Sequence, residues 1–341
     1  MAQLISDVRP GAAEAAKTQP IDLSILIVTW NSERWIDRCL RSLPLACDGL
    51  VYEVLVHDNA SSDSTLAIAR THVPDDSSAD RVEEPLRLIA SETNAGFAGG
   101  INRSFHESRG RYVLLLNPDC EPAPEAVTRL YEFLETHPAV AGAAPLLIDD
   151  DGTVQREFQL RRLPTLRTLA SEVLLLDKVF PTSRAMARHR YRDADLNEAQ
   201  PIEQPAAAAL LLRREVFEEV GPFDEQFSPA WFEDVDYCQR LMKLRRETWV
   251  VPASRVGHHG GASLEHMEFA HFAGIWYGNM WRYAKKWLRP AEAETLRWII
   301  VFGMMLRGAA GVAGLRPPGV GRGDAFRAYW QVLTKALTRW K

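Results

Sequence analysis

Arg111–Cys120, RYVLLLNPDC, is the stretch of sequence that decides the fold. Tyr112–Leu116 is a continuous apolar run, short enough for one strand, and its lack of polar residues predicts burial on both faces. The run stops at Asn117–Asp119, where Pro118 has no N–H and cannot continue a central strand. Asp119 is therefore expected at the carboxyl end of a buried strand, where ligands bind in open α/β sheets. A carboxylate at that place suits a hard divalent cation, although a simple Asn-Pro-Asp turn is the favoured interpretation of this stretch taken alone.

The composition of the 341 residues is that of an ordinary globular protein, with 46% hydrophobic and 25% charged residues. The formal net charge of −5 argues against general nucleic-acid binding. Four cysteines without C-x-x-C spacing fit a reducing, cytoplasmic compartment and argue against a zinc site. Residues 1–20 lack the apolar segment of a signal peptide, so we interpret them as a disordered leader.

Three more apolar segments precede the opening stretch, and each is followed by polar residues and then by a helical pattern. The predicted strands are Leu23–Thr29, Tyr52–His57 and Leu86–Ala90. Their alternation with helices predicts an α/β fold with a mostly parallel, doubly wound sheet. The carboxyl ends of parallel strands meet at one edge, so the polar clusters around Asn31 and at Asp58–Asp63 predict a nucleotide-binding crevice there. For any one cluster, ordinary turn chemistry is the competing interpretation.

The glycines that follow the third strand, Gly96, Gly99 and Gly100, are expected to let the backbone approach a ligand closely. They do not match G-x-G-x-x-G, which argues against a dinucleotide-binding site. The sequence also lacks the G-x-x-x-x-G-K-[ST] pattern of a P-loop.

The second half of the chain contains an acidic cluster and a histidine pair. A helix that starts near Glu233 would carry Glu233, Asp234 and Asp236 in its first turn, among aromatic residues that suggest a partly dry pocket for a catalytic base. The alternative is a solvated acidic turn that merely starts the helix. The strand Thr248–Pro252 is followed by His258-His259, of which one side chain should face the site, whereas a purely structural pair is the simpler interpretation.

Two regions have less distinct patterns. Leu160–Gln204 is expected to be an insertion over the site. The tail from Phe272 is helical and rich in tryptophan and basic residues, and its most apolar stretch, Trp298–Leu306, is too short to cross a bilayer. The tail is expected either to dock on a membrane surface as an interfacial helix pair, or to pack against the rest of the chain or a second subunit as a homodimer.

Seven segments, taken in order, resemble family 2 glycosyltransferases of the GT-A fold, in particular the bacterial rhamnosyltransferase-like branch. They are LSILIVTWNS, VHDNASSDST, ETNAGFAGGIN, LLLNPDC, LLLRREVFEEVGPFDEQF, WFEDVDYCQR and VGHHGGAS. The resemblance covers about residues 21–265. It divides that catalytic domain into a nucleotide-sugar-binding half, residues 21–120, and an acceptor half, residues 121–265, and it leaves residues 266–341 as a helical extension.

The resemblance implies a role for each matching residue. Asp119, in place of the family's two-acid motif, and His258 would bind Mg²⁺ or Mn²⁺. Asp234 would be the general base, with Glu233 beside it. The donor-binding residues would be Thr29, Asn31, Asp58, Asn94, Gly96, Asn102, Asn117 and Asp119.

Two positions depart from the family pattern. Ala207 stands where relatives usually carry glycine, which puts the acceptor side in question. Gly278-Asn279 stands where many relatives have Arg-Asn, so a diphosphate-binding arginine is missing or is replaced by Arg282.

The resemblance implies an inverting, metal-dependent glycosyltransferase of bacterial cell-surface polysaccharide synthesis. The donor would be dTDP-rhamnose, with a UDP-sugar as the alternative, and the acceptor a saccharide or a lipid-linked saccharide. The expected location is the cytoplasm or the inner face of the cytoplasmic membrane. A glycoside hydrolase would also use paired carboxylates but needs neither a metal nor nucleotide-binding loops. A module that binds nucleotide sugars without catalysis would not need Glu233, Asp234 and Asp119.

Overall fold

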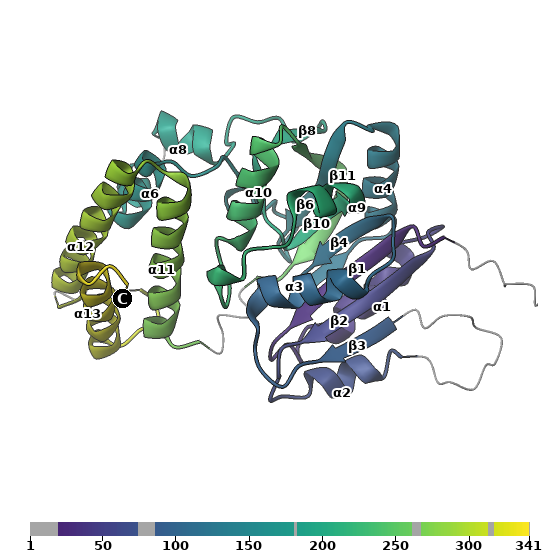
Figure 1. The fold of residues 1–341 in the computed structure, drawn as a ribbon, viewed down its shortest axis with the longest axis horizontal. Helices are drawn as coiled ribbons and strands as arrows, with labels where there is room; N and C mark the ends of the chain where they lie inside the picture. The colour runs from purple at the N-terminus through teal and green to yellow at the C-terminus, as the bar shows by residue number, and fades with distance from the viewer. Residues whose placement is uncertain (1–19, 74–85, 181–182, 261–266, 313–316, 341) are drawn as a thin grey trace, which may run out of the picture.

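The computed structural model describes residues 20–73, 86–180, 183–260, 267–312 and 317–340. The predicted leader therefore lies outside the described residues, apart from Pro20. A twisted central sheet with helices on both faces forms one part of the molecule, and a group of helices that includes the C-terminal tail forms the other (Figure 1).

The sheet runs in the order β3-β2-β1-β4-β10-β6-β11-β5, and β8 pairs with β11 beside this path. Its first four strands are parallel, with bounds close to the predicted ones: β1 (Leu23–Thr29), β2 (Tyr52–Asp58), β3 (Leu86–Ala90) and β4 (Tyr112–Leu116). The other five are β5 (Cys120–Pro122), β6 (Val140–Ile148), β8 (Gln200–Ile202), β10 (Ala209–Arg213) and β11 (Glu247–His258). Strand β10 runs antiparallel to both β4 and β6, and it joins the parallel half to the rest of the sheet.

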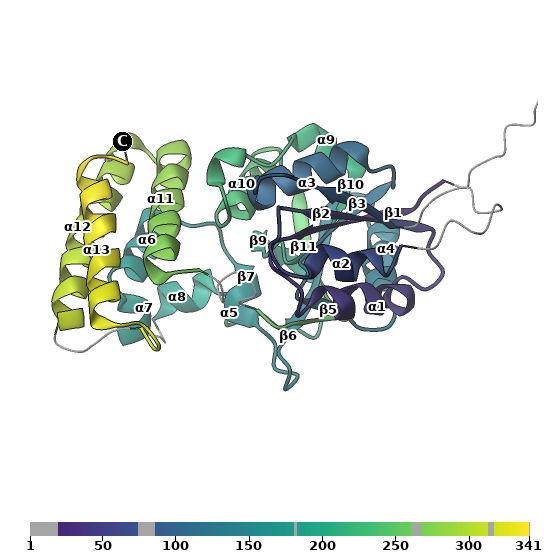
Figure 2. The ribbon, with the colours of Figure 1, turned by 90° about the horizontal axis from the view of Figure 1, so that it is seen from below.

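Both faces of the central strands are buried, as the apolar runs predict. Ile25 and Ile27 of β1 belong to the core beneath α1 (Ile36–Ala46) and α4 (Ala126–Thr136). Leu26 and Val28, which alternate with them, face the opposite layer. That layer consists of α3 (Gly96–Glu107), α9 (Arg214–Val220) and α10 (Glu233–Lys243), while α2 (Thr65–Arg70) lies beside α1 (Figure 2).

Strand β11 is one long strand with an irregular pairing between Val250 and Arg255, and the predicted strand Thr248–Pro252 is its first part. Its last residues pair antiparallel with β5, so that His258 stands opposite Cys120. Two segments that are far apart in sequence thus meet immediately after the Asn-Pro-Asp turn.

The region Leu160–Gln204 consists of short elements, and several of its side chains line the cavity described below, as an insertion over the site should. The elements in and around it are α5 (Arg156–Gln159), α6 (Leu166–Val173), α7 (Leu176–Val179), α8 (Arg184–His189), and β7 (Leu160–Arg161) paired with β9 (Gln204–Pro205). A 3₁₀ turn, η1 (Glu225–Phe227), precedes α10.

The tail forms three helices, α11 (Phe269–Trp287), α12 (Pro290–Val312) and α13 (Arg322–Leu337). Their core also takes in Leu169 of α6 and the α10 residues Val235 and Cys238. The predicted boundary near residue 265 stays a prediction, but the tail is packed against the rest of the chain through this shared core. None of the helices among the described residues is both long and apolar enough to span a membrane.

The loop glycines allow close contacts within the protein. Gly96 has φ +76°, and a Cβ there would lie 2.7 Å from the carbonyl oxygen of Pro229. A Cβ on Gly100 would lie 2.7 Å from Val28. These glycines let α3 pack against β1 and against the loop before α10, and the expected close approach of the backbone to a ligand stays a prediction.

Candidate functional site

A cavity of about 1060 Å³ opens at the carboxyl ends of the parallel strands. Residues at or after the ends of β1, β2, β3 and β4 line it: Thr29, Asn59, Asn94, Gly96, Asn117 and Asp119. Glu233, Asp234 and His258 also line it. The topology therefore gathers at this edge most of the polar residues that the sequence pointed to.

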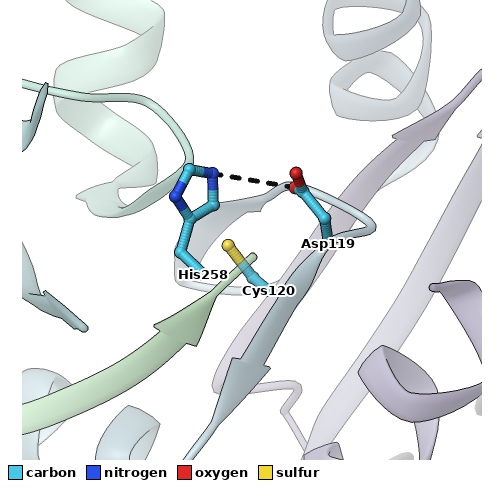
Figure 3. Close-up of side chains that lie close together, drawn as sticks. All are labelled: Asp119, Cys120 and His258. Carbon is cyan, nitrogen blue, oxygen red and sulfur yellow. Dashed lines mark ion pairs between the residues drawn. The ribbon is translucent and has the colours of Figure 1, made fainter. Parts of the chain in front are cut away.

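Asp119 and His258 face each other in this cavity (Figure 3). The pairing of β5 with β11 brings them together, and Asp119 Oδ1 lies 3.8 Å from His258 Nε2. Both side chains are buried. Together with Cys120 they form a group of potential metal ligands whose atoms all lie within 4.8 Å of one another.

Gln155 sets the protonation of the His258 ring. Its Oε1 lies 2.7 Å from His258 Nδ1, and its Nε2 donates to the His258 carbonyl at 2.6 Å. An Nδ1–H that donates to this acceptor leaves the lone pair of Nε2 directed toward Asp119. Burial lowers the pKa of the His258 imidazole, against the opposite effect of the Asp119 carboxylate, so the ring is neutral as a metal ligand must be.

Cys120 does not fit as a third ligand for Mg²⁺ or Mn²⁺. Its Sγ donates to the Ala208 carbonyl at 3.2 Å, and burial raises the pKa of the thiol well above its ordinary value. A thiol is a poor ligand for these cations, which prefer oxygen. The carboxylate of Asp119 and the imidazole of His258 do fit a divalent cation, with the remaining positions open to water and phosphate oxygens.

His259 has different partners. It stacks on Trp35 with a ring-centroid separation of 4.6 Å, and its Nδ1 lies 2.7 Å from Asp150 Oδ1. We therefore expect His258→Ala to lower the affinity for Mn²⁺ by at least tenfold and His259→Ala to leave it within about twofold. Titration of the two variants with Mn²⁺, followed by electron paramagnetic resonance of the unbound ion, measures this. The reverse ranking would overturn the assignment.

Gln155→Leu tests the second layer of this site. The substitution removes the acceptor that holds the proton on His258 Nδ1, and loss of such a partner typically weakens metal binding by roughly 10–100-fold. The same Mn²⁺ titration should show this loss, and Gln155→Glu, which keeps an acceptor oxygen, should recover much of the affinity. Equal affinities for wild type and Gln155→Leu would contradict the role of Gln155.

Glu233 and Asp234 form the start of α10, as predicted, and both line the cavity. Burial raises the pKa of Glu233 well above its ordinary value, and the Asp234 charge raises it further, while Glu233 Oε2 is buried without a hydrogen-bond partner. Burial also raises the pKa of Asp234. There, however, the backbone N–H of Val235, at 2.8 Å, and the charge of Arg161 favour the ionised form. The environments thus separate the two groups into a neutral Glu233 and an Asp234 that can act as a base.

Asp236, the third acid of this turn, is not available as an alternative base. Its carboxylate accepts from Trp287 Nε1 at 2.7 Å and Arg240 Nε at 3.1 Å, and it pairs with Lys286 Nζ at 2.7 Å. It is fully buried and connects α10 to the end of α11.

Asn279, at the site where many relatives have Arg-Asn, holds a loop in place. Asn279 Nδ2 lies within hydrogen-bond distance of the carbonyls of Phe227, Ala230 and Trp231, and so holds the loop that leads into Glu233. Arg282 does not replace the missing arginine in the cavity, because its guanidinium donates to Asn279 Oδ1 at 2.6 Å and it does not line the cavity.

Three predicted donor-binding residues lie outside the cavity lining and hold loops in place. Asp58 accepts from the Thr29 hydroxyl at 2.8 Å and from the Ser61 hydroxyl and N–H. Asn31 accepts from the Ser62 N–H at 2.8 Å. Asn102 bonds to both the N–H and the carbonyl of Phe223. Each side chain bonds to a neighbouring loop, and the direct contact with a donor expected for Asn31, Asp58 and Asn102 stays a prediction.

Several cavity residues escaped the sequence analysis. Asn59 lies one residue after Asp58, and its amide bonds to the Gly96 carbonyl and the Ala95 N–H. Arg161, His189 and Gln204 come from the insertion, Arg156 comes from α5 just before it, and His271, Phe272 and Trp276 come from α11. Gln204 Nε2 lies 3.3 Å from Asp234 Oδ2. The short elements of the insertion have no clear period and gave no signal for its residues, and the helical pattern of the tail did not indicate that α11 reaches the cavity.

The model of the family described as Glycosyl transferase family 2 matches residues 24–221, which is more than half of the chain. The match runs from β1 to the end of α9 and so includes the carboxyl ends of β1, β2, β3 and β4.

Two proteins with similar sequences have names that refer to glycan synthesis or glycosyl transfer. The N-acetylglucosaminyl-diphospho-decaprenol L-rhamnosyltransferase of Mycobacterium tuberculosis (strain ATCC 25618 / H37Rv) is 28% identical over 262 residues, which cover 74% of this chain and 80% of that protein. The succinoglycan biosynthesis protein ExoO of Rhizobium meliloti (strain 1021) is 31% identical over 154 residues, which cover 42% of this chain and 40% of that protein.

A solved structure, GalNAc-T7 with UDP, GalNAc and Mn²⁺, superimposes with a TM-score of 0.53 at 13% identity. The match covers 94% of this chain, which spans 56% of that longer one. The likeness shows a common fold, that of GT-A glycosyltransferases.

Proposed function

Because this chain belongs to glycosyltransferase family 2, we propose that it transfers a sugar from a nucleoside diphosphate donor to a hydroxyl group in cell-surface glycan synthesis. The observation that carries the proposal is one cavity that holds both an Asp119–His258 pair and a Glu233–Asp234 pair. L-Rhamnose from dTDP-rhamnose is the donor we favour, because the mycobacterial relative is named as an L-rhamnosyltransferase.

The donor side of the proposed complex is the strand edge. Thr29, Asn94, Gly96 and Asn117 line it directly, and Asn59 joins them. Asp58 and Asn31 hold the loops beside this edge. A divalent cation bound by Asp119 and His258 would offset the negative charge that develops on the diphosphate as it leaves.

The chemical step requires one base. An acceptor hydroxyl forms a bond to the anomeric carbon, its proton passes to the Asp234 carboxylate, and the bond from that carbon to the diphosphate oxygen breaks with its electron pair on the diphosphate. One such displacement inverts the anomeric centre. The neutral Glu233 can donate a hydrogen bond to a sugar or acceptor oxygen, and Gln204 holds Asp234 from the side.

The acceptor side of the cavity is aromatic. Trp231, Phe232, Phe272 and Trp276 line it, and Trp231 contacts Phe272 at a ring-centroid separation of 5.0 Å. Aromatic faces suit the apolar faces of sugar rings. We propose a saccharide or lipid-linked saccharide as acceptor, in line with the diphospho-decaprenol acceptor in the relative's name.

A panel of nucleotide sugars tests the proposal. With Mn²⁺ or Mg²⁺ present, dTDP-rhamnose should raise the melting temperature most, since a ligand at 100 times its Kd adds about 2.7 kcal/mol of stability. The alternative donor is a UDP-sugar. If a UDP-sugar raised the melting temperature more than dTDP-rhamnose does, it would be the favoured donor. Breakdown of the nucleotide sugar that requires an acceptor identifies a transferase. Breakdown of glycosides without any nucleotide would identify a hydrolase. Binding of a nucleotide sugar without turnover would identify a non-catalytic module.

A further inference from the structure

Helix α12 buries one apolar face and exposes another. Leu296, Ile300 and Met304 are buried in the tail core. Trp298, Phe302, Met305 and Leu306 lie on the opposite side of the helix and are each about half exposed. The second face is therefore not needed to fold the tail, and nothing else among the described residues covers it.

Helix α13 exposes a matching stripe. Phe326, Trp330 and Leu337 recur at helical spacing, and the first two rings are stacked at 6.3 Å. Arg297 Nη1 of α12 donates to the Ala336 carbonyl of α13 at 3.0 Å, which places the start of α12 beside the end of α13.

The two stripes thus run along neighbouring helices, at the end of the molecule farthest from the sheet (Figures 1 and 2). Together these seven residues, which are all between 48% and 57% exposed, form what we call the outer face. An apolar surface of this kind on several adjacent turns marks an interaction site.

The tail that carries the outer face has a charge opposite to that of the whole chain. Residues 266–341 contain twelve lysines and arginines and four acidic residues, although the chain has a net charge of −5. Arg322 and Arg327 flank Phe326 on α13, and the Arg327 side chain is 73% exposed. The nearby acids include Asp324, 3.8 Å from Arg327, and Glu294, which contacts Trp298 and is paired with Arg297 and Arg339. No acidic residue follows Asp324 in the sequence.

Two basic residues of the tail are engaged in contacts within the protein. Arg297 is buried and bonds to Glu294 and to Ala336. Lys286 pairs with Asp224 and Asp236. Arg322 and Arg327 of α13 therefore supply exposed positive charge beside the outer face.

We propose that the outer face is a docking surface for a lipid bilayer with anionic head groups. Exposed tryptophans beside arginines suit the boundary between head groups and acyl chains, where the apolar side chains insert and the cations meet lipid phosphates. A second copy of the chain would bring the same arginines against one another, which disfavours a symmetric dimer through this face. The inference does not depend on which sugar is transferred, or on transfer at all.

Vesicle flotation of the full chain tests this. Wild type should float with vesicles of phosphatidylcholine and phosphatidylglycerol at low salt and less at high salt, and should bind pure phosphatidylcholine weakly. The variant Trp298→Ser/Phe302→Ser/Trp330→Ser should lower the partition coefficient by about tenfold or more. Arg322→Gln/Arg327→Gln should lower it about thirtyfold on anionic vesicles, since each cation near such a surface contributes about 1 kcal/mol.

Matched controls change equally exposed residues of α1. Leu45 is 66% exposed and the Arg41 side chain 72% exposed, so Leu45→Ser and Arg41→Gln should float like wild type. Unchanged thermal melting of each variant shows that it is folded. Absence of flotation at low salt would overturn the proposal. A second result would also overturn the proposal: wild type does not bind vesicles and is a dimer by light scattering, whereas the outer-face variant is a monomer. The occupant of the outer face would then be a second copy of the chain.

Discussion

Asp119→Ala is expected to abolish glycosyl transfer and leave the fold intact. Among the described residues, Asp119 is the only carboxylate in the group of potential metal ligands, so its loss leaves one imidazole to hold the cation. A metal that neutralises a leaving diphosphate contributes several kcal/mol to the transition state, which corresponds to a rate loss of roughly 10³-fold or more. Transfer assays with saturating Mn²⁺ or Mg²⁺ measure the loss, and EDTA should have the same effect on wild type.

The control for this prediction is Asp48→Ala, which removes an exposed carboxylate after α1. It should retain full activity and metal affinity. Full activity of wild type in EDTA would contradict metal dependence. A large loss in Asp119→Ala with unchanged Mn²⁺ affinity would instead place Asp119 on the donor itself.

Most of the sheet could be predicted because its strands are buried on both faces. Runs such as Leu23–Thr29 and Tyr112–Leu116 contain so few polar residues that a two-sided core is the simplest way to bury them. The position of β10 was not accessible in this way. Its apolar residues fit a strand, but neither its antiparallel direction nor its place between β4 and β6 follows from local sequence.

The Asp119–His258 pair could be named from the sequence only through the family resemblance. The physical cause of their approach is the pairing of β5 with β11, a contact between segments that are far apart in the chain. Gln155 was missed for the same reason. A glutamine in a loop gives no local signal that its amide will meet the His258 ring.

Asp58 and Asn102 show the opposite difficulty. Short polar side chains at strand ends suit a ligand, but they suit the backbone of a neighbouring loop equally well. Asn102 satisfies both backbone groups of Phe223, and Asp58 satisfies Thr29 and Ser61. Composition cannot distinguish these outcomes, because the direction of each side chain is set by the loop that packs beside it.

Asp234→Asn is expected to lower the transfer rate by roughly 10²–10⁴-fold, the usual loss when a general base is removed. The amide keeps the shape of the side chain, so donor and Mn²⁺ binding should stay near the wild-type values in a thermal-shift titration. The exposed Asp48→Asn serves as control. A rate within about threefold of wild type would contradict the assignment, and Asp236 could not take over because Trp287, Arg240 and Lys286 already hold it.

The pH profile separates Asp234 from Glu233. Burial raises the pKa of Asp234, so the fraction of ionised base falls, and the rate with it, as pH decreases through a value above that of an exposed aspartate. This acidic limb should disappear from the residual activity of Asp234→Asn. Burial favours the neutral form of Glu233, and the amide of Glu233→Gln resembles that form. Glu233→Gln should therefore lower the transfer rate much less than Asp234→Asn does. If Glu233→Gln instead abolished transfer and removed the limb, Glu233 would be the base, and the neutral state that its environment favours would have to be reversed by the bound substrates.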